Sequence, residues 1–145
     1  MNMNAIEEAI HRYVNERMDK GKKQATERFL AYAYMKFCGE ELLEFMKKVG
    51  GISRYYMDFL SVMKNPFKGP EFAWLMSLFI LGVIGCMLVS DPDSRNLGIF
   101  TLTGVIVNGW TLLSTLFKKW LKLSVLIAIY RELAEISDSE AHSIN

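Results

Sequence analysis

The segment that most constrains this chain covers residues 97–117 and contains no charged residue. Its length of about 21 residues is enough for an α-helix to cross the hydrocarbon core of a bilayer. A second uncharged segment, residues 72–90, is almost as long. Core helices of soluble bundles normally keep a polar face, which makes a soluble bundle the less favoured interpretation. The sequence therefore predicts an all-α integral membrane protein with a two-span transmembrane helical hairpin.

The two uncharged segments set the boundaries of the other parts. We expect a cytosolic three-helix unit over residues 1–65, transmembrane helices over 72–90 and 97–117, an external turn over 91–96, a cytosolic or interfacial amphipathic helix over 118–136, and a disordered tail over 137–145. A turn this short makes the two spans antiparallel neighbours. No glycine or proline follows Trp110, so the second span is predicted to continue into the cytoplasm as one long helix to about Ile136.

Glycines mark the expected helix ends within residues 1–65. The hydrophobic spacing predicts helices over about residues 1–21, 22–48 and 54–64. Gly21 is expected to end the first helix, Gly39 to break or bend the second, and Gly50-Gly51 to end the second. Because a unit of this size is short for an independent core, we expect it to dock on the membrane or on another copy.

Basic residues gather on one side of the two spans. Arg54, Lys64 and Lys68 precede the first span and three lysines follow the second, whereas the turn has Arg95 against two aspartates. This asymmetry predicts a multi-pass protein of the cell inner membrane with both termini in the cytoplasm. The residues expected at the membrane interface are Trp74, Lys118, Lys119, Trp120 and Lys122.

A stripe of small and polar residues follows the second span. Its members recur at alternating steps of three and four, which places them on one face of a helix. They are Thr101, Gly104, Asn108, Thr111 and Thr115. Asn108 is the most informative member, because an amide at this depth needs a hydrogen-bond partner. That partner is either Asn108 of another copy or the backbone of its own helix.

Two interpretations of this stripe remain open. Small and hydroxyl-bearing residues let helices approach closely, so the stripe can pack against other copies or against a patch on the first span formed by Gly82, Gly85 and Cys86. Alternatively, several copies can turn the stripe towards a water-filled pore, with Lys118 and Lys122 at its cytoplasmic mouth. No ionisable residue lies within either span, which argues against a proton relay.

Residues that support catalysis are sparse. The cysteines and the histidines, His11 and His142, form no pair with the short spacing of a zinc site. The sequence contains no glycine-rich phosphate loop and no nucleophile elbow. The acidic residues Glu40, Glu41 and Glu44 are interpreted as a solvated helix face. We therefore expect no enzymatic activity, no cofactor and no metal site, which leaves open an enzyme complex whose catalytic residues lie in another chain.

The charge balance bears on the partners. A net charge of +1 and a pI of about 7.7 give no reason to expect a nucleic-acid partner. The lipid bilayer is the expected partner of the two spans. Lys20, Lys22 and Lys23 form either a solvated turn or a site for acidic lipid headgroups.

The layout of the second half of the chain is similar to that of small phage holins. It combines a two-span hairpin, cytoplasmic ends, a polar stripe and a lysine-flanked exit from the membrane. This architectural resemblance implies formation of a pore or membrane lesion. We therefore expect a small non-enzymatic membrane protein that forms a homo-oligomer through its transmembrane helices. The alternative is a membrane-tethered interaction, immunity, exclusion or regulatory protein in which residues 1–65 bind a protein partner.

Overall fold

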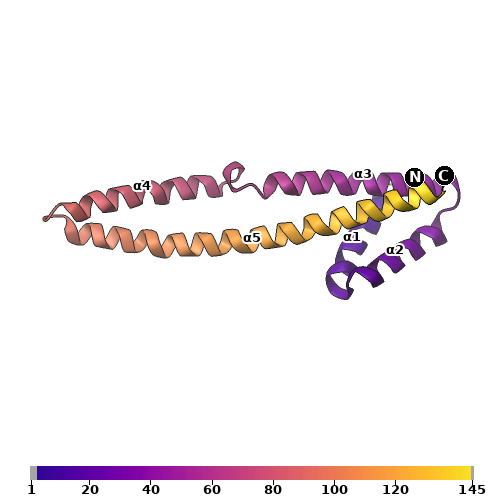
Figure 1. Cartoon of the computed structure of the whole chain (residues 1–145), viewed down its shortest axis with the longest axis horizontal. Coiled ribbons are helices and arrows are strands. Elements are labelled where there is room, and N and C mark those ends of the chain that lie inside the picture. The colour runs from indigo at the N-terminus through magenta and orange to yellow at the C-terminus, as the bar shows by residue number, and fades with distance from the viewer. Residues whose placement is uncertain (1–2, 145) are drawn as a thin grey trace. The chain divides into compact units, whose positions relative to one another are not determined.

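The structure is a computed structural model that describes residues 3–144, apart from the side chain of Pro66. The described residues form five α-helices and one short 3-10 helix, with no strand among them. The helices are α1 (Met3–Lys20), α2 (Lys22–Lys36), α3 (Glu40–Met63), η1 (Pro66–Lys68), α4 (Glu71–Ser90) and α5 (Arg95–Ile144), as Figure 1 shows. The chain therefore has the all-α architecture predicted from its sequence.

The helices belong to two compact units. The first, which we call the helical unit, comprises Met1–Ser61 and Leu123–Asn145. The second, the hairpin unit, comprises Val62–Lys122. α5 has no break and contributes its first half to the hairpin unit and its second half to the helical unit. The helical unit thus has a fourth helical segment in addition to the three helices expected over residues 1–65.

Glycines lie in the two connections among the first three helices, but not at all of the predicted positions. Gly21 follows α1 with a φ of 87°, and Gly39 precedes α3 with a φ of 57°, a left-handed conformation that glycine adopts without strain. The expected end at Gly50-Gly51 is wrong, because α3 continues through both residues. Gly50 is buried against α5, where a Cβ would lie 3.1 Å from the Asp138 carboxylate. Close packing at this position offsets the helix-propensity cost of a glycine, about 1 kcal/mol.

The core of the helical unit draws on α1, α2, α3 and the second half of α5. Aromatic rings connect these helices: Phe29 meets Tyr13 edge-on at 5.8 Å between ring centroids, and Phe45 stacks on Phe37 at 4.6 Å. The largest fully buried side chains are those of Tyr13, Phe45, Ile6, Ile10, Met46, Leu133, Val49, Ser53 and Ser137. The unit therefore has a hydrophobic core of its own.

The disordered tail expected over residues 137–145 is not observed, since α5 remains helical through Ile144; Asn145 lies outside the described residues. Ser137 and Ala141, one turn apart, are both buried. Arg54 of α3 donates a 2.6 Å hydrogen bond to Asp138, and Tyr34 of α2 donates a 2.5 Å hydrogen bond to Glu140. Tertiary contacts thus hold a segment whose polar sequence predicted disorder.

The hairpin unit is built on an antiparallel pair, α4 and the first half of α5, joined at residues 91–94. The least exposed residues on each helix recur at steps of three and four, the spacing of a coiled-coil contact line. We call this line the seam; it contains Leu75, Leu78, Gly82, Gly85 and Val89 of α4 and Gly98, Leu102, Val105, Gly109, Leu112 and Leu116 of α5. Glycines on the seam allow the two helices to approach closely.

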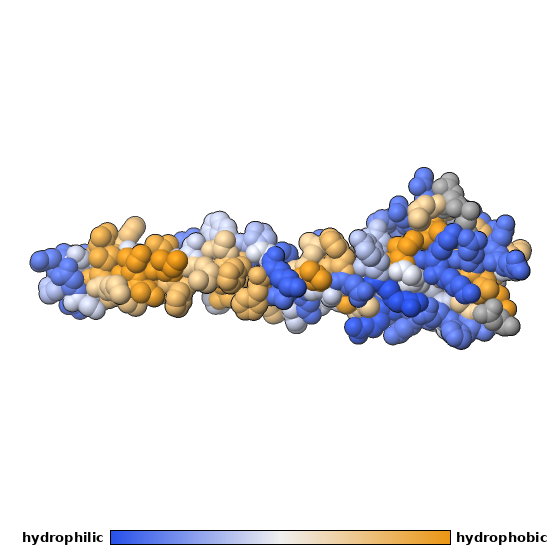
Figure 2. All heavy atoms as spheres, turned by 90° about the horizontal axis from the view of Figure 1, so that it is seen from above, coloured by the Kyte–Doolittle hydropathy of each residue, from blue (hydrophilic) through white to orange (hydrophobic). Residues whose placement is uncertain are grey.

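Outside the seam, the hairpin unit exposes large apolar side chains. Gly85 is the one buried residue of α4, and Phe100 and Trp110 of α5 are 78% and 77% exposed. Figure 2 shows apolar surface over this hairpin and a mainly hydrophilic surface over the helical unit. α4 and α5 are the two helices long and apolar enough to cross a membrane.

Candidate functional site

The polar stripe on α5 lies beside the seam. Each stripe residue directly precedes a seam residue, as Asn108 precedes Gly109, so it is rotated by about 100° around the helix from the seam. Asn108, Thr111 and Thr115 are exposed, whereas Thr101 and Gly104 are half-buried. A Cβ added to Gly104 would meet no atom within 4 Å. The hairpin therefore leaves the stripe uncovered over most of its length.

The polar side chains of the stripe donate hydrogen bonds to their own helix. Asn108 donates from Nδ2 to the Gly104 carbonyl at 2.8 Å. Thr101, Thr111 and Thr115 donate to carbonyls four residues earlier at 2.9 to 3.0 Å. These bonds satisfy the hydroxyl donors and one amide hydrogen of Asn108. Among the described residues, the second amide hydrogen and Oδ1 of Asn108 have no hydrogen-bond partner.

The patch expected on α4 meets α5 through the seam and not through the stripe. A Cβ at Gly82 would lie 3.9 Å from Val105, and a Cβ at Gly85 would lie 2.8 Å from Leu102. Cys86, the third residue of that patch, is exposed. The packing of the hairpin itself therefore does not account for the stripe.

Sequence reasoning missed Gly98, where α4 and α5 approach each other most closely among the glycines of the seam. A Cβ at this residue would lie 2.5 Å from the backbone nitrogen of Val89, a distance that side-chain rotation cannot relieve. The available signal was its position: Gly98 begins the three-four series of seam residues on α5. The polar residues of the stripe, on the neighbouring face, form the more conspicuous pattern in the sequence.

The interface residues predicted from sequence lie in the hairpin unit. They are near the start of α4 and near the point where α5 leaves the hairpin unit. Lys119 forms an ion pair with Glu71, and the Lys64 ammonium lies 4.2 Å from the centroid of the Trp120 ring. Trp74 is 63% exposed, and Lys118 and Lys122 are exposed. Glu71 was not singled out from sequence, although a carboxylate in the first turn of a helix interacts favourably with the helix dipole.

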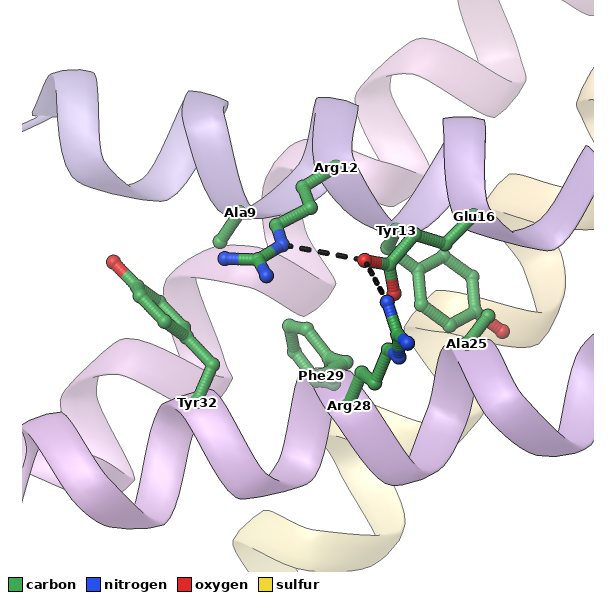
Figure 3. A pocket seen from close by; sticks show the side chains of 8 residues that line it. All are labelled: Ala9, Arg12, Tyr13, Glu16, Ala25, Arg28, Phe29 and Tyr32. Carbon is green, nitrogen blue, oxygen red and sulfur yellow. Dashed lines mark hydrogen bonds and ion pairs between the residues drawn. The ribbon is translucent and has the colours of Figure 1, made fainter. Parts of the chain in front are cut away.

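The helical unit holds a second cluster of charged residues, in a groove between α1 and α2. Figure 3 shows the Glu16 carboxylate pointing towards two arginines, with Phe29 and Tyr32 beside them. Arg12 lies 3.4 Å and Arg28 lies 3.3 Å from the same carboxylate oxygen. Both arginines are more than half exposed, so the cluster is a solvated link between the two helices.

A more enclosed ion pair joins α1 to α5 within the helical unit. Arg17 donates to both oxygens of Glu132, at 2.8 and 3.1 Å, which is the bidentate geometry of strong arginine–carboxylate pairs. Hydrogen bonding from Arg17 lowers the pKa of Glu132, and the same bond raises the pKa of Arg17. Nearby, burial raises the pKa values of Tyr13 and Tyr130. The Arg17–Glu132 pair stabilises the packing of α1 against α5, and Tyr13 also lines the groove between α1 and α2.

No group of three or more histidine, cysteine, aspartate and glutamate side chains among the described residues is placed to hold a metal ion.

Comparison with known proteins adds no relative: no protein-family model, curated protein or solved structure matches this chain. Two surfaces of the hairpin unit are the candidate functional sites: the uncovered stripe of α5 and the basic residues at the helix ends.

Proposed function

We propose that this chain is a small non-enzymatic membrane protein whose hairpin crosses a bilayer and associates with hairpins of other copies through the stripe of α5. Support for insertion comes from two helices of sufficient length whose large apolar side chains are exposed. Support for orientation comes from the basic residues at the hairpin base, which favour a cytoplasmic location of both termini in a cell with a bacterial-type inner membrane.

One observation carries the self-association. The seam joins α4 to α5 through a face that excludes the stripe, and Asn108 keeps an N–H and a carbonyl oxygen without a partner among the described residues. In hydrocarbon, two such amides from neighbouring copies can satisfy each other. The hydroxyl donors already bond to the backbone, so lipid can tolerate the monomer. Association therefore stabilises the oligomer by a moderate free energy.

Pore formation is the most concrete form of this proposal. In an oligomer whose stripes face a common centre, the threonine hydroxyl oxygens and Asn108 supply a polar lining. Lys118 and Lys122 extend the same helical spacing at the cytoplasmic end. An oligomer whose stripes pack in pairs has the same contacts without a lumen, so conductance distinguishes the two forms.

The substitution Asn108→Leu tests the stripe. We expect it to weaken association in nanodiscs or detergent by about three- to twentyfold, the range for one interhelical hydrogen bond, and to abolish any vesicle permeability. The matched control is Thr103→Leu, because Thr103 is exposed, bonds to its own backbone and lies off the stripe. Light scattering and conductance on the same sample provide the measurement. An Asn108→Leu protein with wild-type oligomers and wild-type permeability would contradict the proposal.

A second candidate is a membrane tether for a protein-binding domain. The helical unit favours it, because this unit has its own hydrophobic core and exposes Met35 and Tyr55 at 87% and 68%. In that case the hairpin serves only as an anchor. Replacing residues 71–117 by an unrelated two-span hairpin separates the candidates, since a tether retains its cellular activity and a pore or stripe-mediated oligomer loses it.

A further inference from the structure

We propose that the base of the hairpin is a binding surface for anionic phospholipid headgroups, formed by Lys68, Lys118 and Lys122. This inference rests on the proposed membrane insertion and adds the lipid class that the hairpin selects. We call these three lysines the basic collar. The collar differs from the polar stripe in its chemistry and in its partner, since it acts on phosphate and not on another copy of the chain.

Charge is unevenly distributed within the hairpin unit. Its base contains five lysines, Lys64, Lys68, Lys118, Lys119 and Lys122, and one carboxylate, Glu71, for a net charge of +4. The turn at the other end contains Arg95 with Asp91 and Asp93, for a net charge of −1. Between the two ends no residue is charged. Such a surface attracts negatively charged lipid at one end of the hairpin only.

Local contacts divide the five lysines into two classes. Lys119 is neutralised by the Glu71 carboxylate, and Lys64 lies over the Trp120 ring. Lys68, Lys118 and Lys122 are exposed, and in the described part of the chain none of the three forms an ion pair. The charge available to a ligand is therefore concentrated on the basic collar.

The same contacts bring the collar together from two segments. Lys64 and Glu71 flank the connection that contains η1, and both contact adjacent residues of α5, Trp120 and Lys119. The connection is thus held against this turn of α5 at both ends. Lys68, between Lys64 and Glu71 in the chain, thus belongs to a segment that is held beside the turn of α5 containing Lys118 and Lys122, although about 50 residues separate them in sequence.

The surroundings of the collar indicate a headgroup at a bilayer surface. Phe117 and Trp120 are 61% and 46% exposed within the same turns as the lysines, and Trp74 is exposed on α4. Aromatic rings of this kind lie at the level of the headgroups, and lysine stems extend along apolar surface while their ammonium groups reach polar surroundings. A phospholipid can therefore contact the lysines through its phosphate and the aromatic rings through its acyl chains.

The test uses Trp120 as a local reporter of the bound lipid. In the full-length protein, Trp74→Phe and Trp110→Phe leave Trp120 as the only tryptophan. This protein is placed in vesicles that mix ordinary phosphatidylcholine with either brominated phosphatidylglycerol or brominated phosphatidylcholine. Bromine quenches tryptophan at short range, so the two series give the relative binding constant of anionic over zwitterionic lipid at the collar.

We expect anionic lipid to be preferred at the collar, and this preference to decrease with added salt. In the same tryptophan background, Lys68→Gln, Lys118→Gln and Lys122→Gln together should reduce the preference by up to about a hundredfold, or about fivefold for each lysine. The matched control removes the same charge from the helical unit with Lys20→Gln, Lys22→Gln and Lys23→Gln, and should leave the preference unchanged. Circular dichroism checks that both variants keep their helical content.

The possible failures are distinguishable. Equal quenching by both brominated lipids, or a preference that survives in the collar variant, overturns the collar while leaving insertion intact. Loss of the preference in the Lys20, Lys22 and Lys23 control but not in the collar variant assigns the lipid site to the helical unit and also overturns the inference. Absence of quenching by either lipid shows that the hairpin is not in the bilayer, which rejects the proposed function together with the collar.

Discussion

The two halves of α5 have the same secondary structure and opposite surroundings. In the first half, Phe100 and Trp110 are 78% and 77% exposed, whereas in the second half Ile129 and Leu133 are 3% and 0% exposed. The first half has one neighbouring helix, α4, and the second half lies in a core with α1, α2 and α3. Both halves are therefore helical. The second half buries its apolar side chains among neighbouring helices, whereas the first half leaves most of its apolar side chains exposed.

The two units also differ in their net charge and in how the charged residues are distributed. The helical unit has 11 basic and 13 acidic residues, for a net charge of −2, and it distributes them over its surface. The hairpin unit has six basic and three acidic residues, for a net charge of +3, all of them at its two ends. A unit in water tolerates charge over its whole surface, whereas a hairpin that spans a membrane, as proposed for this one, confines its charge to the interfaces. Three predictions follow from this contrast, and they are given in order of decreasing effect on stability.

The largest effect should come from shortening an apolar side chain in the buried half of α5. Leu133→Ala leaves a cavity in the core of the helical unit and should destabilise that unit by about 2–5 kcal/mol. Leu113→Ala makes the same change at a side chain that is 58% exposed in the first half of α5, and should leave the helical unit unchanged. Hydrogen exchange of α1–α3 amides, measured on the full-length protein in nanodiscs, gives both values. Similar losses in the two variants would contradict the division of α5 into a packed half and an exposed half.

A smaller effect should distinguish the two faces of the hairpin. Gly98→Ala places a methyl group against the backbone of Val89 and should destabilise the hairpin by about 1–3 kcal/mol. Gly104→Ala adds the same methyl group on the stripe, where no atom lies within 4 Å, and should keep the hairpin intact. Unfolding in sodium dodecyl sulfate, followed by tryptophan fluorescence, measures the difference. If Gly104→Ala destabilised the hairpin more than Gly98→Ala, the assignment of the seam and the stripe would be reversed.

Local features of the sequence predicted much of this architecture. The absence of charge over residues 72–90 and 97–117 is a property of consecutive residues, and it predicted two apolar helices and the short connection between them. Gly21 likewise marks a helix end through its own conformational freedom. The helical spacing of the stripe was also visible, because it depends only on the periodicity of α5.

Features that depend on distant residues were not predicted. α3 passes through Gly50-Gly51 because α5 packs closely there, and residues 137–144 are helical because α2 and α3 supply partners for Glu140 and Asp138. The seam is offset by one residue from the stripe, and a single helix periodicity does not reveal which of two neighbouring faces meets the partner helix. In each case the deciding contact comes from a part of the chain far away in sequence.

The smallest of the three effects concerns the ion pair that holds α5 to α1. Arg17→Gln removes a bidentate partner from the half-buried Glu132 and should cost about 1–2 kcal/mol at pH 7, less than the loss of a core side chain. Because the folded-state pKa of Glu132 is lowered, the pair stabilises the fold fully above the unfolded pKa of about 4.5, and this contribution is lost as the pH falls through the folded pKa.

Thermal unfolding of the helical unit at pH 7 and at successively lower pH provides the measurement for Arg17→Gln. The variant and the wild type should converge in acid, since protonated Glu132 no longer benefits from Arg17. Arg12→Gln is the matched control, because its exposed pair with Glu16 lies on the same helix and should contribute less than about 1 kcal/mol. A stability difference between Arg17→Gln and the wild type that stays constant down to the lowest pH would mean that the Arg17 stem, and not its bond to Glu132, holds α5 against α1.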